Sequence, residues 1–209
     1  KEYILSKSKL PSSRVEVVNN IINPSKFSFN EGKHLNYLNQ DKIIIVSSTA
    51  YWQEWRKGKD LLMQILRSFL KLKNKKVEFR IIGKIDLDQD LIKHSVLYGQ
   101  INDNLLISDI LNSSTCLIMP SRLENLTQTI CEALFCGLPV LAFDVGGNNE
   151  IINNEKLGFL FKYPNTKNFI DYVNYLFSND SLEKRRERAN YARKKFSNSR
   201  IIKQHLKIY

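Results

Sequence analysis

The chain contains 209 residues, of which 43% are hydrophobic and 25% charged, and it carries a formal net charge of +11. This apolar content can fill one substantial core, and no stretch approaches the roughly 18 consecutive apolar residues that cross a bilayer. The three cysteines lack C-x-x-C spacing and the three histidines are scattered, which argues against a disulfide framework, a zinc site and a catalytic triad. We therefore expect a globular protein with buried thiols in a reducing compartment.

Residues 1–40 are expected to form a linker, because their Pro, Ser and Gly punctuation is typical of connecting segments. The first residues are charged and lack the apolar centre of a secretory signal. A start at Lys1 instead of Met predicts that the sequence is a piece of a longer protein.

From residue 42 onward, short apolar runs alternate with segments of helical periodicity. The apolar runs predict strands at 42–48, 77–83, 95–99, 115–121, 138–143 and 158–163. The periodic segments predict helices at 59–73, 104–114, 126–137, 150–154, 166–179 and from 181 to the end. This alternation is typical of an α/β fold with a doubly wound, Rossmann-like parallel sheet. We expect a ligand-binding domain at 41–180, followed by basic helices at 181–209 that pack on the domain or cross away from it.

Ligands of such sheets bind at the carboxyl ends of the strands, so the connecting loops are the places to look for function. The loop at 120–127 opens a helix that ends in Gly-Leu-Pro, and a helix N-terminus is a ready site for a diphosphate. Glu124 lies just before this helix and Glu132 about two turns inside it, where carboxylates could accept hydrogen bonds from sugar hydroxyls. Spacing alone leaves a second interpretation open: Glu132 falls opposite the apolar stripe of Ile130 and Leu134, as a solvent-facing residue would.

The loop at 47–59 gathers Arg56, Lys57 and Lys59 around a glycine at another helix start. A lysine makes a point-charge contact with phosphate, and the glycine lets the backbone approach closely. Trp52 and Trp55 either stack on a base or pack against the neighbouring helix. Standing alone, the basic residues would be interpreted as ordinary surface charges.

The stretch from 120 to 152, PSRLENLTQTICEALFCGLPVLAFDVGGNNEII, resembles the donor-binding region of retaining glycosyltransferases of family 4, which have the GT-B fold. Glu124 and Glu132 match that family's motif of Glu, seven residues, Glu, and RKGKDLL at 56–62 is similar to its phosphate loop. Less specific likenesses to the family's hinge, base-binding loop and closing helix lie at 18–27, 98–106 and 196–209. The resemblance covers nearly the whole chain and implies the C-terminal half of a GT-B fold.

The resemblance also implies roles for individual residues in a nucleotide-sugar site. Lys57, with Arg56 as a helper, would pair with the diphosphate of the donor. Glu132 would hold the ribose hydroxyls, and Glu124, as the catalytic residue, would sit against the sugar near its reacting face. The remaining contacts would run largely through backbone, with Asn125, Leu126 and Thr127 cradling the diphosphate and Gln100 and Ile101 meeting the base.

The implied activity is transfer of a hexose, with retention, from a UDP- or GDP-linked donor, without a metal ion or another cofactor. A lysine and a helix dipole fit the stabilisation of a departing diphosphate. The implied partner is an N-terminal, acceptor-binding domain, without which the chain would bind nucleotide but not turn over. The implied setting is bacterial surface polysaccharide or glycan synthesis in the cytoplasm, with peripheral contact to the inner face of the membrane.

Three departures from the family pattern bear on the site. Ser47-Ser48 stands where the family often has Gly-Arg, so either Arg56 substitutes for that arginine or the contact is absent. A Gly-x-Gly has become Gly-Lys-Ile at 83–85, which leaves that side of the pocket unassigned. Asp-Leu-Asp at 86–88 mimics a metal-binding motif of another fold, but its context favours a solvated acidic loop.

Much of the positive charge lies in 181–209. It indicates first a solvated helical face and second a surface for anionic lipid. A nucleic-acid site comes last, because no nucleic-acid-binding motif accompanies the charge. We expect no nucleic-acid partner. Two alternatives to the transferase remain open: a non-catalytic nucleotide-sugar-binding module that docks on a membrane or partner, and a GT-B-fold epimerase or phosphorylase.

Overall fold

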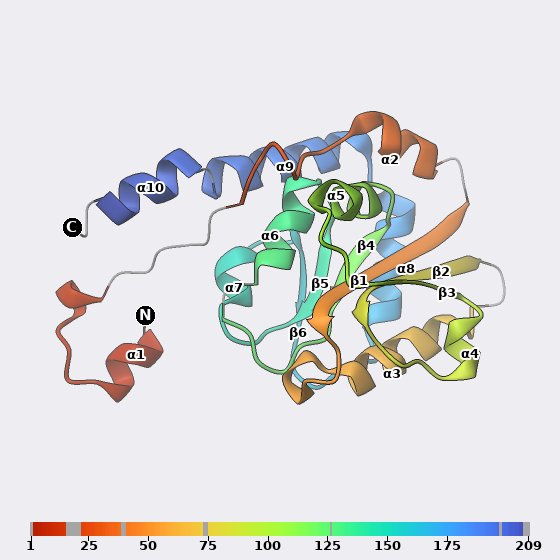
Figure 1. Cartoon of the computed structure of the whole chain (residues 1–209), viewed down its shortest axis with the longest axis horizontal. Coiled ribbons are helices and arrows are strands. Elements are labelled where there is room, and N and C mark those ends of the chain that lie inside the picture. Colours follow the sequence, from red (N-terminus) through yellow and green to blue (C-terminus); the bar gives the residue numbers. More distant parts are fainter. Residues whose placement is uncertain are drawn as a thin grey trace.

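A computed structural model of the protein describes residues 2–15, 22–38, 41–72, 75–125, 127–196 and 198–206. Its centre is a six-stranded sheet with the strand order β3-β2-β1-β4-β5-β6, in which every neighbouring pair runs parallel (Figure 1). The strands are β1 (Lys42–Tyr51), β2 (Lys76–Lys84), β3 (Ser95–Gly99), β4 (Cys116–Met119), β5 (Val140–Phe143) and β6 (Gly158–Phe161). The chain winds outward from β1 to β3, then returns to continue from β4 to β6. The order therefore reverses between β1 and β4, which is where doubly wound sheets bind ligands.

Helices cover both faces of the sheet. One face packs against α3 (Lys59–Phe69) and α8 (Phe169–Asn179), and the other packs against α5 (Asn104–Asn112), α6 (Gln128–Phe135) and α9 (Leu182–Lys195). The remaining helices are α1 (Glu2–Lys7), α2 (Glu31–Leu38), α4 (Gln89–Ile92), α7 (Asn148–Ile151) and α10 (Asn198–Leu206), with short 3-10 turns η1 (Ser12–Arg14) and η2 (Trp55–Lys57). No helix in these described ranges is long and apolar enough to cross a membrane.

The central strand explains the two-sided core. Ile43 and Ile45 pack with the α3 and α8 side, whereas Val46 packs with the α5 and α6 side, and all three side chains are fully buried. A strand covered on both faces needs apolar residues at every position, because neither face meets water. This is why the strands of this sheet are continuous apolar runs in the sequence.

Part of the N-terminal segment lies on the domain itself. The helix α2 packs against α5 and α9, and the buried side chain of Asn112 accepts from the backbone N–H of Asn30 at 2.7 Å and donates to the carbonyl of Ser28 at 2.9 Å. In Figure 1, α1 lies apart from the sheet. Within the expected linker, residues 22–38 are therefore part of the folded body.

All six predicted strands are present, and the differences are local. β1 continues three residues beyond the predicted end, to Tyr51, and its register against β2 shifts between Ser48 and Tyr51. The helix predicted at 150–154 lies instead at Asn148–Ile151. The helices α1, α2 and α4 were not predicted. The segment of α2 contains a glycine and few apolar residues, and α4 has only four residues.

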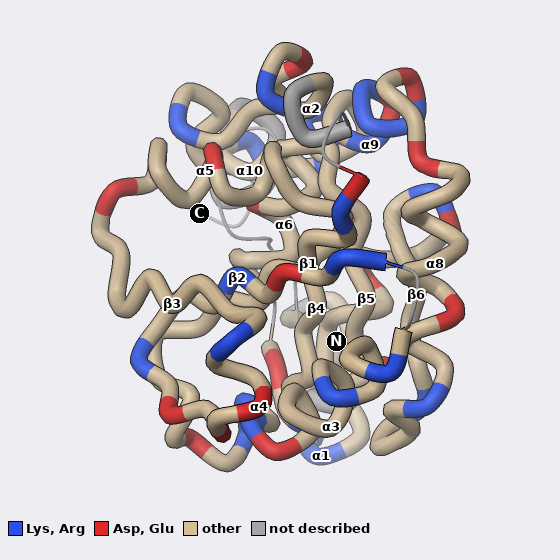
Figure 2. The backbone as a smooth tube through the Cα atoms, turned by 90° about the vertical axis from the view of Figure 1, so that its right-hand side faces the viewer, with Lys and Arg blue, Asp and Glu red and all other residues tan. Residues whose placement is uncertain are grey.

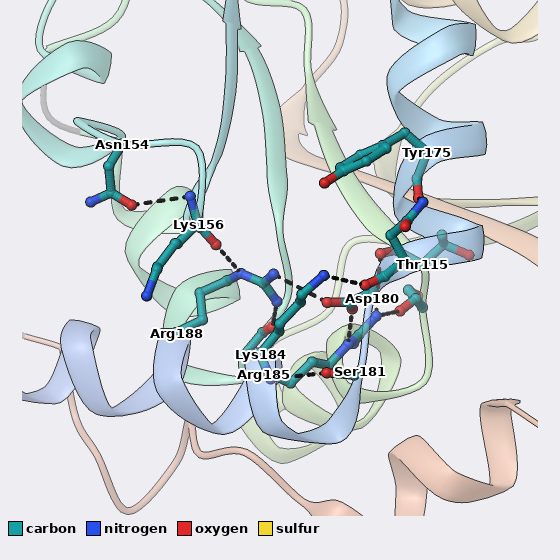
Figure 3. Close-up of polar contacts among 12 residues, drawn as sticks. Thr115, Asn154, Lys156, Tyr175, Asp180, Ser181, Lys184, Arg185 and Arg188 are labelled. Carbon is teal, nitrogen blue, oxygen red and sulfur yellow. Dashed lines mark hydrogen bonds and ion pairs between the residues drawn. The ribbon is translucent and has the colours of Figure 1, made fainter.

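Buried ion pairs fix α9 to the amino end of the sheet. The Asp180 carboxylate lies 2.6 Å from Nε of Arg185 and 3.1 Å from Nη2 of Arg188, and all three side chains are almost fully buried (Figure 3). Arg185 also donates to the carbonyl of Ser114, and Arg188 to the carbonyl of Lys156, each at 2.7 Å. Burial alone would raise the pKa of Asp180, but the two guanidinium groups hold it below its ordinary value. Two cations of the basic tail are therefore structural.

The first turns of α9 carry acidic residues among the basic ones, whereas the described residues after Glu187 carry basic charge alone. Figure 2, which views the molecule from the right-hand side of Figure 1, shows Lys and Arg interspersed with Asp and Glu along the chain. Along α9, exposed Arg186 pairs with Glu31, and Lys156 pairs with Glu187. The part of the tail that the structure describes thus combines two buried structural arginines, a stretch of both signs up to Glu187 and a purely basic stretch at 193–203.

Candidate active site

The structure brings Lys57 and Glu124 into direct contact at the point where the strand order reverses. Lys57 ends η2, just beyond the carboxyl end of β1, and Glu124 lies in the loop after β4. The Lys57 Nζ is 2.7 Å from Oε1 of Glu124, and the two side chains are only 13% and 7% exposed. The two residues assigned to the diphosphate and the sugar therefore form a largely buried ion pair with each other.

Close backbone contact holds the two loops at this distance. Gly58 has a φ of 69°, and a Cβ atom there would lie 2.1 Å from the carbonyl oxygen of Pro120. The backbone N–H of Arg122 donates to the carbonyl of Arg56 at 2.7 Å. Only a glycine combines this left-handed conformation with such a close approach, so it sets the position of Lys57.

Arg122 braces the same loops from the side. Its guanidinium makes two hydrogen bonds to the carboxylate of Asp60, at 2.8 and 2.6 Å, and one to the carbonyl of Trp55 at 3.0 Å. The hydrogen bonds from Arg122 lower the pKa of Asp60. The indole of Trp55, which is 67% exposed, lies against the guanidinium with the Arg122 Cζ 5.1 Å from the ring centroid. Trp55 is therefore an exposed ring held on a rigid loop, and no motif marked Arg122 as its support.

A third loop supports Glu124 from the β5 side. Gly146 has a φ of 56°, and a Cβ atom on it would lie 1.7 Å from the carbonyl oxygen of Glu124. The backbone N–H of Gly147 donates to the carbonyl of Asn125 at 2.8 Å. Glycine is thus required at position 146 because this loop contacts the backbone of Glu124.

The N-terminus of α6 opens beside the ion pair. Thr127 occupies the N-cap position, but its hydroxyl does not cap the helix and instead donates to Oδ1 of buried Asn148 at 3.1 Å. Among the described residues no acceptor takes a hydrogen bond from the backbone N–H of Asn125 or Thr127. Leu126, the third predicted member of the diphosphate cradle, lies outside the described residues. Free N–H groups and the positive end of a helix dipole make this position favourable for an anion.

Glu132 lies farther along α6, where it is half-buried instead of facing solvent freely. Its side chain is largely enclosed, because α6 packs against α5, α9, β4 and β5. Burial raises the pKa of Glu132 to about 7, and no described residue donates a hydrogen bond to its carboxylate. A carboxyl group kept in such surroundings without a partner is unfavourable for folding and is typical of a ligand-binding position.

Three other predicted site residues lie away from the Lys57–Glu124 pair. Arg56 is 46% exposed and pairs with Glu54 at 2.6 Å, so it lies at the rim. Gln100 is exposed after β3, at the edge of the sheet, and half-buried Ile101 packs against the hydrophobic core. None of the three contacts Lys57 or Glu124 through a hydrogen bond or ion pair between described side chains.

The positions that depart from the family pattern have structural roles here. The hydroxyl of buried Ser47 donates to the carbonyl of Ile118 at 2.7 Å, which ties β1 to β4 at the reversal point. Trp52 is buried, with Nε1 donating to the carbonyl of Ile82 at 3.0 Å. Gly83 has a φ of 101°, and a Cβ there would lie 1.7 Å from the carbonyl oxygen of Thr49. The contacts of Trp52 and Gly83 accompany the extension of β1 past its predicted end.

The acidic loop at 86–88 carries an ion pair, since the Asp88 carboxylate pairs with Arg67. Within the described ranges no three side chains of His, Cys, Asp or Glu gather as metal ligands would. Burial raises the pKa of Cys131 and of Cys136 to about 12, so both are inert thiols at neutral pH.

Residues 29–195 match the family described as glycosyl transferases group 1. The chain belongs to this glycosyltransferase family. One relative is the Escherichia coli protein named UDP-Gal:alpha-D-GlcNAc-diphosphoundecaprenol alpha-1,3-galactosyltransferase, which is 36% identical over 84 residues, or 40% of this chain and 21% of that protein. This glycosyltransferase chain spans less than half the length of the first three curated relatives it matches, at 21%, 43% and 45%.

Solved structures of glycosyltransferases share the fold at low sequence identity. HepE of Anabaena, solved with UDP and glucose, superposes with a TM-score of 0.75 at 16% identity, over 99% of this chain and 59% of that one. The C-terminal domain of a glycosyl transferase group 1 family protein from Francisella tularensis gives a TM-score of 0.63 at 18% identity, over 82% of this chain and 94% of that one. The α/β glycosyltransferase domain is therefore of the GT-B type, as predicted.

Proposed function

We propose that the chain is the donor-binding domain of a retaining hexosyltransferase that takes its sugar from a UDP- or GDP-linked donor. Membership of the glycosyltransferase family supports sugar transfer as the class of reaction. The observation that carries the proposal is the buried Lys57–Glu124 pair at the open N-terminus of α6, with the unpartnered carboxyl of Glu132 farther along the same helix.

In this proposal Lys57 and the α6 N-terminus stabilise the leaving group. The bond between the anomeric carbon and the diphosphate breaks, and negative charge builds up on the diphosphate oxygens. A buried ammonium group and the N–H groups of Asn125 and Thr127 would meet that charge, and donors directed at developing charge are the strongest source of transition-state stabilisation. We propose that these groups, and no metal ion, balance the charge.

The two glutamates are proposed to accept hydrogen bonds from hydroxyl groups on either side of the diphosphate. Glu124 would take hydroxyls of the transferred sugar as the catalytic residue, and Glu132 those of the ribose. A buried carboxylate left unpaired disfavours ligands that lack the matching hydroxyls, so such positions discriminate strongly. Gln100 and Ile101, at the end of β3, are proposed to meet the base, and Arg56 to approach the diphosphate from the rim.

Two of the related proteins support a UDP-linked donor and a lipid-linked acceptor. HepE was solved with UDP and glucose, and the name of the Escherichia coli relative includes UDP-Gal and a diphosphoundecaprenol acceptor. We propose that the present chain works with an N-terminal acceptor-binding domain in bacterial surface polysaccharide or glycan synthesis. That reaction would take place in the cytoplasm, at the inner face of the membrane.

Calorimetric titration of the chain with UDP, GDP, ADP and CMP tests the proposal, with and without EDTA. We expect one nucleoside diphosphate to bind without added metal, and Lys57→Ala and Glu132→Ala each to weaken binding by about 1–3 kcal/mol, as for a lost charged hydrogen bond. Lys156→Ala is the matched control, because its side chain is 80% exposed and precedes β6, at the opposite end of the sheet. Absence of binding, or equal losses in all three variants, would overturn the assignment of this site to a nucleotide-sugar donor.

A further inference from the structure

We propose that Glu124 makes the site select the intact nucleotide sugar over the free nucleoside diphosphate, by exchanging its partner from Lys57 to the hydroxyls of the sugar. This inference rests on the proposed function, and it assigns to one contact the discrimination between substrate and product. It begins from the ion pair that the protein forms on its own, 2.7 Å long and largely buried.

The first step is the competition for Lys57. In the described part of the chain, the Glu124 carboxylate forms no hydrogen bond or ion pair except the one with Lys57. A diphosphate has more negative charge than a carboxylate, so it draws the ammonium group toward itself. The Glu124 side chain, 7% exposed, would then be a buried carboxylate without its cation and next to another anion. Both changes are unfavourable in a medium of low polarity.

The second step is that the backbone of Glu124 cannot withdraw from the anion. Its carbonyl oxygen is in close contact with Gly146, and the next carbonyl, that of Asn125, accepts the N–H of Gly147. The opposite loop is fixed as well, by Gly58 against Pro120. New hydrogen bonds to the Glu124 carboxylate must therefore compensate for the loss of its contact with Lys57.

The third step is that a sugar supplies those hydrogen bonds. Hydroxyl groups of a hexose can donate to both carboxylate oxygens, so the intact donor replaces the lost ammonium contact, whereas the free diphosphate does not. After the sugar has moved to the acceptor, the carboxylate is unpartnered again and recovers Lys57. The same exchange that favours the donor therefore favours departure of the product nucleotide.

Titrations with free nucleotide and nucleotide sugar separate these effects. The probes are UDP and UDP-glucose, or GDP and GDP-mannose if the guanine nucleotide is the one that binds. The proteins are the parent chain, Glu124→Gln, Glu124→Ala as a second variant should the first fail to fold, and Glu155→Gln as the control. Glu155 is exposed before β6, at the other end of the sheet, so its substitution changes the net charge equally without touching the site.

We expect Glu124→Gln to bind the free diphosphate about five- to tenfold more tightly than the parent, because the like charge is gone and Lys57 is released. Binding of the nucleotide sugar should stay equal or become weaker, so that the preference for the sugar-bearing form falls by about tenfold or more. Equal changes for both ligands, or a weaker free diphosphate, would overturn the exchange while leaving the nucleotide site intact. A parent chain that binds neither nucleotide would overturn the proposed function itself.

Discussion

Gly146 and Glu124 are in backbone contact so close that a Cβ atom on the glycine would lie 1.7 Å from the glutamate carbonyl oxygen. Gly147 reinforces the contact by donating its N–H to the carbonyl of Asn125. The loop after β5 therefore sets the position of the loop after β4, and with it the carboxylate that pairs with Lys57.

Gly146→Ala should move the Glu124 loop. We expect a loss of about 2–4 kcal/mol in the free energy of unfolding, from the unfavourable φ and the clash together, and weaker binding of nucleotide sugar. Urea unfolding and calorimetry measure the two effects. Gly99→Ala is the matched control for stability, because Gly99 has a φ of 62° but open space around it, so roughly 1 kcal/mol is expected. Equal losses in both variants would show that the contact with Glu124 is unimportant.

Glu132→Gln should stabilise the folded protein above neutral pH. The folded pKa of about 7 lies above the ordinary value of 4.5, so the folded state retains a proton that the unfolded state loses. The stability contribution of this group is therefore greatest below pH 4.5, falls as the pH rises, and is lost above 7. We expect the variant to exceed the parent by up to about 3 kcal/mol at pH 8 and by little near pH 5. Urea unfolding at both pH values tests this, and an unchanged or less stable variant at pH 8 would contradict it.

The affinity for a nucleotide sugar should rise with pH in the range where Glu132 ionises. Only the carboxylate is an acceptor without a proton on either oxygen, so that each oxygen can take one ribose hydroxyl, and it forms as the pH passes about 7. UDP-glucose is the appropriate probe, since its diphosphate lacks the terminal phosphate group that titrates near pH 6. We expect roughly tenfold tighter binding at pH 8 than at pH 5.5, and a flat profile for Glu132→Gln. A parent profile without a rise would argue against contact between Glu132 and the ribose.

Asp180→Asn should be strongly destabilising, because it leaves Arg185 and Arg188 buried without their counter-ion. Breaking one side of a buried ion pair costs about 3–5 kcal/mol, which urea unfolding resolves. Since the folded pKa of Asp180 lies below 3.8, its contribution is present above that pH and disappears as the pH falls through the folded pKa. Glu183→Gln, at an exposed position on the same helix, should stay within about 0.5 kcal/mol of the parent. A small effect at Asp180 would mean that water reaches the pair.

The sequence by itself determined the strands and the class of fold. Residues 43–46 are apolar at every position because β1 is covered on both faces, and this pattern needs no knowledge of its neighbours. The pattern of two glutamates and the RKG segment likewise pointed to a glycosyltransferase, and the match to glycosyl transferases group 1 confirms that class. Assignment of roles to Glu124, Glu132 and Lys57 remains a prediction.

Only the tertiary structure decided how the site is built. The helical spacing of α6 placed Glu132 opposite an apolar stripe, yet α5, α9 and the sheet enclose the helix on more than one side and leave that residue half-buried. The contact between Lys57 and Glu124 joins residues 67 positions apart, and it depends on β1 and β4 becoming neighbours. Local periodicity reports which side of an element is apolar. Packing between distant parts of the chain decides which elements surround it. That packing therefore also decides the pKa of a carboxyl group and the contact partner of a glycine.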